Sequence, residues 1–216
     1  MGMGTEVREN IAKRAAQEID NGMIVNLGIG IPSLVPNYLK NKPQVMIQAE
    51  NGILGIGSTP LQGEEEETLC NAAGYPVTLE KGASYFDTTT AFGMIRRGCI
   101  DLTILGSLQV SEKGDLANWI VPGKRVPGMG GAMELAGKAK KVIVVMNHVN
   151  KNGDPKILTS CTLPLTSKQC VDLIITDMAV IEVHETGLIL KEIMVPFTVQ
   201  DVMKCTGAKL EIGMNL

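Results

Sequence analysis

Short runs of aliphatic and β-branched residues, separated by segments with helical periodicity, limit how this chain can fold. Such runs occupy residues 23–27, 45–48, 102–105 and 142–146. Runs of this length that are apolar almost throughout are typical of strands buried on both faces of a parallel sheet. Helical segments between strands favour parallel pairing, because the chain must cross back over the sheet. The predicted fold is therefore α/β, with a three-layer arrangement of an open, mixed, mainly parallel sheet and helices on both faces.

The helical segments have recognisable ends. Apolar residues at every fourth position predict a helix over residues 6–19, with Thr5 as its N-cap. Pro32 is suited to the first turn of a helix that reaches Leu39. Helices are also expected over residues 88–97, ended by Gly98, and over residues 134–138. The stretch between the strand at 45–48 and the helix at 88 is expected to be a long polar loop.

The last third of the chain has a different pattern. Short, closely spaced apolar runs lie at 157–158, 173–175, 180–183 and 188–190. They predict antiparallel pairing at an edge of the sheet. Thr198 and Asp201 are spaced as in a capping box and predict a final short helix that Gly207 ends.

The sequence contains no internal repeat and no linker that would indicate a domain boundary. Residues 1–216 are therefore predicted to be a single domain. The hydrophobic fraction of 44% with only 3% aromatic residues indicates a core of aliphatic side chains. A mean hydropathy of +0.14 favours a surface that is buried against another chain.

Charge and composition argue against several functional classes. The net charge is -3 and the basic residues are scattered along the sequence, so the chain lacks the clustered basic residues typical of a nucleic-acid-binding protein. No apolar run approaches the roughly 20 residues needed to cross a bilayer, and the first residues lack the apolar core of a signal peptide. The chain is predicted to be cytoplasmic and not membrane-bound.

Metal and disulfide chemistry have little support. The two histidines, His148 and His184, lack ligand spacing, and they are expected to be surface or hydrogen-bonded residues. The five cysteines form no C-x-x-C pair and are expected to be buried, reduced thiols. No metal site is predicted. The acidic run 64–67 is expected to be a solvated loop.

Glu50 is a candidate for chemistry because of its position. It directly follows the strand at 45–48 and precedes Asn51-Gly52, a dipeptide that favours a tight turn with positive φ. Ligands of open α/β sheets bind at the carboxyl ends of strands. Position alone, however, also fits an ordinary turn glutamate that faces water.

Two glycine-rich turns supply possible partners for that carboxylate. Gly28 and Gly30 follow the strand at 23–27, and Gly128, Gly130 and Gly131 precede the helix at 134–138. Glycine backbone at such turns either permits close packing or lets a substrate approach N–H groups that stabilise an oxyanion. The first turn has serine at position 33, where a dinucleotide fingerprint needs glycine, so a Rossmann cofactor site is not expected.

Several segments together resemble the beta chain, or B half, of 3-oxoacid coenzyme A transferases, a family I coenzyme A transferase group, along essentially the whole chain. The matching segments are 26–32 (NLGIGIP), 48–55 (QAENGILG), 81–86 (KGASYF), 114–119 (GDLANW), 128–135 (GMGGAMEL) and 161–166 (CTLPLT).

The resemblance implies which residues act. The family's nucleophile is the glutamate of a Ser-Glu-Asn-Gly motif, and it corresponds to Glu50, followed by Asn51 and Gly52. The family serine is replaced here by Ala49. The family's glycine clusters correspond to Gly28 and Gly30 and to Gly128, Gly130 and Gly131, which are expected to present substrate-facing backbone.

The resemblance also implies an activity and a partner. The expected reaction moves coenzyme A between a short-chain acyl-CoA and a carboxylic acid, such as acetoacetate, succinate, acetate or butyrate, through a glutamyl-CoA thioester. Coenzyme A would be a substrate, with no permanently bound cofactor. The alpha chain of a coenzyme A transferase, its A half, would complete a hetero-oligomer such as A2B2. Two alternatives stay open: a sugar-phosphate type isomerase on a similar scaffold, and a non-catalytic partner chain.

Overall fold

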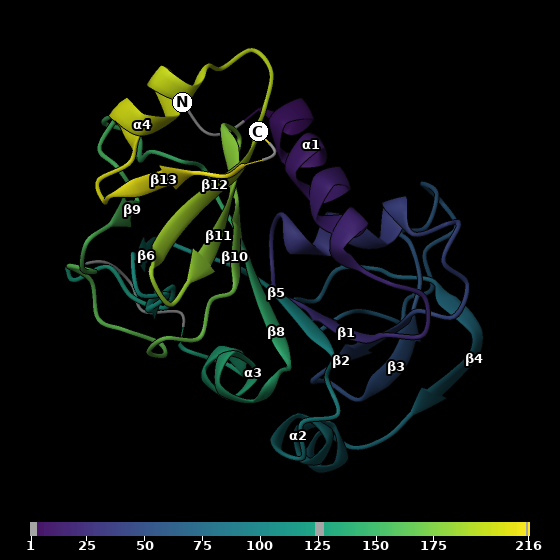
Figure 1. Ribbon diagram of the computed structural model, residues 1–216. Helices are drawn as coiled ribbons and strands as arrows, with labels where there is room; N and C mark the ends of the chain where they lie inside the picture. The colour runs from purple at the N-terminus through teal and green to yellow at the C-terminus, as the bar shows by residue number, and fades with distance from the viewer. Residues whose placement is uncertain (1–3, 124–127, 215) are drawn as a thin grey trace.

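The framework of the protein is a ten-stranded mixed sheet, seen in a computed structural model that describes residues 4–123, 128–214 and 216 (Figure 1). Its strand order is β13-β12-β11-β10-β8-β5-β1-β2-β3-β4. The strands are β1 (Ile24–Leu27), β2 (Met46–Ala49), β3 (Ile53–Ile56), β4 (Leu79–Tyr85), β5 (Leu102–Gly106), β8 (Lys141–Val145), β10 (Leu173–Ile175), β11 (Ala179–His184), β12 (Gly187–Ile193) and β13 (Leu210–Ile212).

The centre of the sheet is parallel and is buried on both faces. Strands β10, β8, β5, β1 and β2 pair in parallel with one another. Along β8, Ile143 and Val145 belong to one apolar core, and Val142 and Val144 belong to the other. Successive side chains of a strand point to opposite faces, so a run without polar positions needs a cover on each side. The predicted three-layer arrangement is confirmed.

Helical segments cover the two faces unequally. One face packs against α1 (Thr5–Ala15) and the 3₁₀ segments η1 (Ala16–Glu18) and η2 (Pro32–Tyr38). The other packs against α2 (Thr88–Arg96), α3 (Ala132–Lys138) and α4 (Val199–Cys205). Figure 1 shows α2 and α3 side by side beneath the sheet, with α1 above it.

The predicted ends of the helices are confirmed in part. The capping box of α4 is present, with Thr198 and Asp201 exchanging side-chain to backbone hydrogen bonds. The expected Thr5 N-cap is wrong by one residue, because Gly4 holds that position and makes no side-chain hydrogen bond. The segment after Pro32 is a 3₁₀ helix, since Pro36 inside it has no N–H for an α-helical hydrogen bond.

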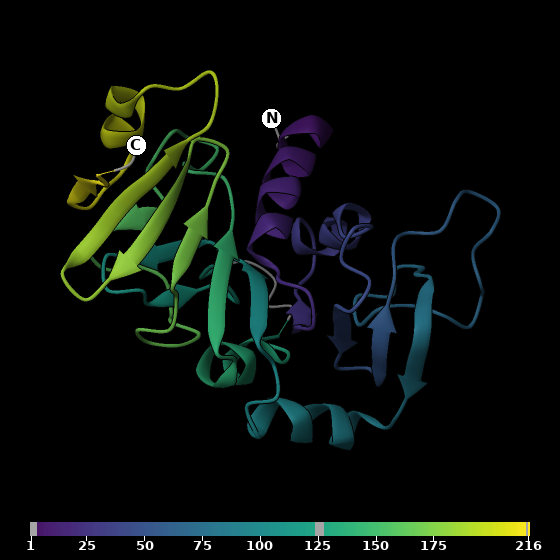
Figure 2. The same cartoon turned by 45° about the vertical axis from the view of Figure 1, so that its right-hand side comes forward.

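The expectation of a loop between residues 49 and 87 is wrong, because β3 and β4 extend the sheet there with antiparallel pairing. Strand β4 is an edge strand that is exposed on both faces, so its sequence carries no alternation of apolar and polar residues. Backbone hydrogen bonds define it instead. In Figure 2 the connection between β3 and β4 projects from one side of the molecule.

A second, three-stranded sheet lies on the α2 and α3 side. It consists of β6 (Gln109–Ser111), β7 (Leu116–Ala117) and β9 (Ile157–Leu158). The run 157–158 was expected at an edge of the main sheet with an antiparallel neighbour, but β9 pairs in parallel with β6. The prediction is confirmed for β11 and β12, which form an antiparallel hairpin.

The cysteines differ from expectation in burial. All five thiols are free, but Cys70 and Cys99 are exposed and the other three are only partly buried. Burial raises the pKa of the Cys161 and Cys170 thiols to about 11, so both stay protonated near neutrality. Within the described part of the chain, no helix combines the length and the apolarity that a membrane crossing requires.

Candidate active site

Glu50 stands at the carboxyl end of β2, in the turn that leads back into β3. Its backbone carbonyl accepts a hydrogen bond of 2.8 Å from the Thr88 hydroxyl at the start of α2. Gly52 has a φ of +104°, as the Asn51-Gly52 dipeptide predicted, and its carbonyl accepts from the Phe86 N–H at 3.0 Å. These contacts hold the backbone of Glu50 from both sides.

The side chain of Glu50 lies against the backbone of Gly131. The Gly131 N–H faces the carboxylate and acts to lower its pKa. A Cβ added at position 131 would lie 3.0 Å from Cδ of Glu50 and closer still to Oε1. Gly131 has an ordinary φ of -78°, so its lack of a side chain serves this contact and not an unusual backbone conformation.

The electrostatic environment disfavours charge on Glu50. Burial raises the pKa of this carboxyl, and hydrogen bonds from the N–H groups of Gly131 and of Glu50 itself offset only part of that effect. Among the described residues, no basic side chain contributes to the shift. The ionised carboxylate is therefore less stabilised than in water, which makes it a stronger nucleophile and base.

A row of buried polar side chains lies beside the nucleophile across three central strands. Gln48, Asn26 and Thr103 are aligned by the register of β2, β1 and β5. Asn26 Nδ2 donates to Gln48 Oε1 at 2.7 Å, and Gln48 Nε2 donates to the Ala91 carbonyl at 3.3 Å. Within the described residues, Asn26 Oδ1 and Thr103 Oγ1 have no hydrogen-bond partner.

Sequence reasoning missed the importance of this row. Its signal was present, because Asn26 and Gln48 interrupt runs that are otherwise apolar. Gln48 and Glu50 are two positions apart, a spacing that in a strand puts side chains on one face. The row therefore shares the α2 and α3 side of the sheet with the nucleophile.

Helices α2 and α3 are tied together next to Glu50. Arg96 donates through Nε and a terminal nitrogen to the two carboxylate oxygens of Glu134, both at 2.7 Å. The guanidinium is largely exposed, so the pair contributes little to folding stability. Its geometric effect is larger, because it links the helix that anchors the Glu50 carbonyl to the one preceded by Gly131.

The other predicted site residues fall into two groups. Gly30, Gly128 and Gly130 line the cleft around Glu50, and a Cβ at any of them would meet open space. Gly28 lines it too, but its N–H is engaged with the Ile104 carbonyl at 2.9 Å, so this amide is not free for a substrate. Asn51 uses its side-chain amide to hold the Cys70 carbonyl at 2.8 Å.

The cleft that contains Glu50 has a volume of about 1120 Å³. Its walls come from the carboxyl ends of β1, β2 and β5, the turn before α3, and the connection between β3 and β4. Within that connection the acidic run 64–67 is exposed, as predicted. A cleft of this size accommodates a ligand much larger than a short-chain acid.

Neither histidine lines this cleft. His148 is fully buried, and its ring nitrogens each lie 2.9 Å from a threonine hydroxyl, Thr176 on one side and Thr206 on the other. Burial lowers its pKa to about 4. His184 is exposed and contacts Thr186. The prediction of surface or hydrogen-bonded histidines is confirmed.

Comparison with known proteins identifies the family. The model of the coenzyme A transferase family, described as "Coenzyme A transferase", matches residues 8–205. The beta chain of a probable coenzyme A transferase of Bacillus subtilis (strain 168) is 66% identical over 99% of both chains. The B chain of the succinyl-CoA:3-ketoacid coenzyme A transferase of Helicobacter pylori is 48% identical over 96% of this chain and 100% of the relative.

Solved structures show the same fold. An acyl-CoA transferase (YdiF) apoenzyme from Escherichia coli O157:H7 superposes with a TM-score of 0.80 at 20% identity, covering 100% of this chain and 44% of that one. The fold, the family model and the full-length relatives agree with the resemblance seen in the sequence. The chain belongs to the coenzyme A transferase family of enzymes.

Proposed function

We propose that Glu50 is the nucleophile of a coenzyme A transferase that exchanges coenzyme A between a short-chain acyl-CoA and a carboxylic acid. One observation carries this proposal. The carboxylate is half-buried, lies against the backbone of Gly131, and stands at the ends of the parallel strands in a large cleft. Support also comes from relatives whose names specify coenzyme A transfer.

The chemistry proceeds by two exchanges and their reverse. A carboxylate oxygen of Glu50 attacks the thioester carbonyl carbon, the C–S bond breaks, and an acyl-glutamyl anhydride and the coenzyme A thiolate result. The thiolate then attacks the glutamyl carbonyl, which releases the first acid and leaves a glutamyl-CoA thioester. An acceptor carboxylate repeats the two steps backwards. Acyl activation is retained throughout, so the transfer needs no nucleotide hydrolysis.

Backbone amides of the glycine turns would stabilise the oxyanions of these steps. Gly131 already lies against the carboxylate, and Gly128 and Gly130 line the same cleft. Loss of one such donor typically costs about 3 to 4 kcal/mol of transition-state stabilisation. The anhydride also needs protection from water. Part of that cover would come from the connection between β3 and β4.

We also propose which carboxylic acids exchange coenzyme A and which chain completes the enzyme. Acetoacetate with succinate, acetate or butyrate are candidate acids, and an alpha chain would complete a hetero-oligomer such as A2B2. Relatives named as the beta or B component of a transferase support a partner chain. A cytoplasmic location and the absence of a resident cofactor or metal stay predictions from the sequence.

The decisive test uses the enzyme assembled from this chain and its coexpressed partner chain. After incubation with acyl-CoA, hydroxylamine or borohydride should modify Glu50, and peptide mass spectrometry should find the adduct there. Glu50→Gln should transfer no coenzyme A and give no adduct. Glu185→Gln, in the exposed turn between β11 and β12, is the control that removes a carboxylate away from the cleft.

The same experiment separates the alternatives. An isomerase would use the carboxylate to move a proton and would form no bond to it. If this chain were a non-catalytic partner, transfer activity would survive Glu50→Gln. Transfer at the wild-type rate by that variant, or an adduct on another residue, would overturn the assignment.

A further inference from the structure

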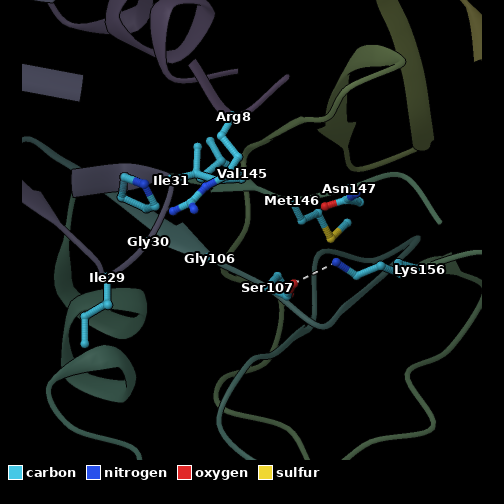
Figure 3. Close-up of a pocket in the computed structure, with 11 residues that line it drawn as sticks. Arg8, Ile29, Gly30, Ile31, Gly106, Ser107, Val145, Met146, Asn147 and Lys156 are labelled. Atoms are coloured by element: carbon cyan, nitrogen blue, oxygen red, sulfur yellow. Dashed lines mark hydrogen bonds between the residues drawn. The ribbon is translucent and has the colours of Figure 1, made fainter. Parts of the chain in front are cut away.

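A second pocket, of about 420 Å³, adjoins the Glu50 cleft at the carboxyl ends of β1, β5 and β8 (Figure 3). Its lining includes Gly30, Gly106 and the turn after β8 that contains Met146 and Asn147. Carboxyl ends of parallel strands are where open α/β sheets bind ligands. This pocket is therefore a candidate ligand site that the reaction at Glu50 does not explain.

The pocket is positively charged. Arg8 enters it from α1, and Lys156 reaches into it from the segment before β9 (Figure 3). Among the residues that the structure describes, none that lines it is acidic. The chain as a whole has a net charge of -3, so two cations in one pocket with no acid among the described lining residues are not an effect of composition. Such an arrangement attracts an anion.

The two cations differ in how they are held. Within the described residues, the side chain of Arg8 makes no ion pair and no hydrogen bond, so its guanidinium is available for a carboxylate or phosphate. Lys156 Nζ donates one hydrogen bond to the Ser107 carbonyl, at 2.9 Å, which fixes its position and leaves two donors. Burial lowers the pKa of Lys156 to about 8, and Asp177 opposes that shift.

The pocket is continuous with the Glu50 cleft. Arg8, Ile29, Gly30, Gly106 and Ser107 line both. Neighbouring strands of a sheet lie about 4.8 Å apart, and β1 is next to β2. One end of a ligand could therefore react at Glu50 while another of its groups lies in the charged pocket.

We propose that this pocket binds a second oxyanion of the substrate, held by Arg8 and Lys156 while the reacting carboxyl or thioester group meets Glu50. The inference rests on the proposed function. The oxyanion is either the distal carboxylate of a dicarboxylic acid or the ribose 3′-phosphate of coenzyme A. The size of the pocket and its position within a few strand spacings of Glu50 favour the carboxylate. Arg8 would then determine the preference between dicarboxylic and monocarboxylic acids.

The test compares succinate with butyrate, two four-carbon acids that differ in the distal carboxylate, as acceptors for the assembled enzyme. Arg8→Met should lower kcat/KM for succinate by roughly 10- to 100-fold and leave butyrate nearly unchanged, because only succinate loses a charge-assisted hydrogen bond. Arg8→Lys should restore part of the loss. Arg97→Met, which removes an exposed arginine at the end of α2, is the matched control.

A second set of measurements tests whether the group bound in the pocket is a phosphate instead of a carboxylate. If the pocket holds a phosphate, Arg8→Met should slow both acids equally and reduce the preference for acyl-CoA over acyl-dephospho-CoA. A parallel loss for both acids with that preference unchanged would overturn the inference. So would wild-type kinetics in Arg8→Met with every substrate.

Direct binding separates this inference from the proposed function. Calorimetry of succinate or inorganic phosphate with the assembled Glu50→Gln enzyme needs no turnover. Anion binding next to Lys156 should raise the pKa of that amine, so near pH 8 it should take up protons and make the heat depend on the buffer. The other charged or titratable groups around Lys156 are Arg8, Asp177 and His148, and the buried His148 ring, with a pKa of about 4, is neutral at this pH. Lys156→Met should abolish the buffer dependence, whereas a buffer-independent heat in the parent would contradict the assignment.

Discussion

The carboxylate of Glu50, at the end of β2, lies against the backbone N–H of Gly131, immediately before α3. The two residues are far apart in the sequence and meet because β2 and α3 converge on one end of the sheet. The contact accounts for a glycine at position 131, since a Cβ would occupy the space of the carboxylate.

Gly131→Ala should therefore impair catalysis much more than folding. The added methyl group must displace the Glu50 carboxylate, and a misplacement of about 1 Å typically costs about 100-fold in rate. The backbone of Gly131 suits alanine, so the melting temperature should change little. Gly137→Ala, inside α3 with open space around the added Cβ, is the control for both measurements. A normal kcat/KM in Gly131→Ala would contradict this account of the contact.

Glu50→Gln should abolish transfer and also stabilise the fold near neutral pH. The carboxyl has a folded-state pKa above its unfolded value, so folding favours the protonated form and ionisation above that pKa destabilises the native state. A neutral amide removes this penalty. We expect a loss of transfer of roughly 10³-fold or more with a higher melting temperature at pH 7. The difference in melting temperature should shrink as the pH falls through the pKa of Glu50.

The same pKa predicts the acid limb of the activity profile. Attack requires the ionised carboxylate, so kcat/KM should fall as the pH decreases through the raised pKa of Glu50. The decline should begin above the ordinary pKa of 4.5 for a glutamate side chain. Initial rates in buffers of constant ionic strength measure it. A profile that stays flat down to the ordinary value would show that the assembled site removes the effect of burial.

Ala49→Ser should affect stability more than activity, although this position departs from the family motif. Ala49 is 6% exposed and packs in the core beneath α1 and η2, on the opposite face of β2 from Gln48. A hydroxyl placed there loses hydration, at a cost of about 1 kcal/mol if it finds no partner. Urea unfolding should report that cost, with kcat/KM almost unaltered. A tenfold change in kcat/KM would mean that the hydroxyl reaches the nucleophile.

His148 should make the protein sensitive to mild acid. Its pKa is lowered to about 4 in the fold from 6.5, so the stability that the neutral ring provides is complete above pH 6.5 and is lost as the pH falls toward 4. The loss should approach about 3 kcal/mol. His148→Gln should lower stability at pH 7 but flatten its dependence on pH in this window. An equal slope in both proteins would exclude His148 as the cause.

The sequence predicted the structure best where a residue pattern depends on contacts within a few residues, or where a whole strand has the same buried environment. The unbroken apolar run at 142–146 predicted a strand buried on both faces, and β8 has that environment. Thr198 and Asp201 predicted a capping box because both partners lie within one helical turn. Strand β4 could not be found in this way, since an exposed edge strand is defined by backbone pairing and places no demand on its side chains.

For the candidate site, too, some features could be predicted from the sequence and others could not. Sequence by itself placed Glu50 at a strand end before a turn, and the family resemblance assigned its role. It could not show that the Gly28 N–H is used by β5 while the Gly131 N–H faces the carboxylate, because both are glycines in similar turns. Nor could it show that Arg8 and Lys156 share a pocket.

The amino-acid sequence thus determined the fold class, the central strands and the identity of the candidate nucleophile. These follow from periodicity, turn chemistry and motifs, which act over a few residues. Only the tertiary structure decided which amide meets the carboxylate, which buried polar groups lie beside it, and which cations converge next to it. Such contacts join segments that are distant in the chain, and their geometry depends on how the whole sheet and its helices pack.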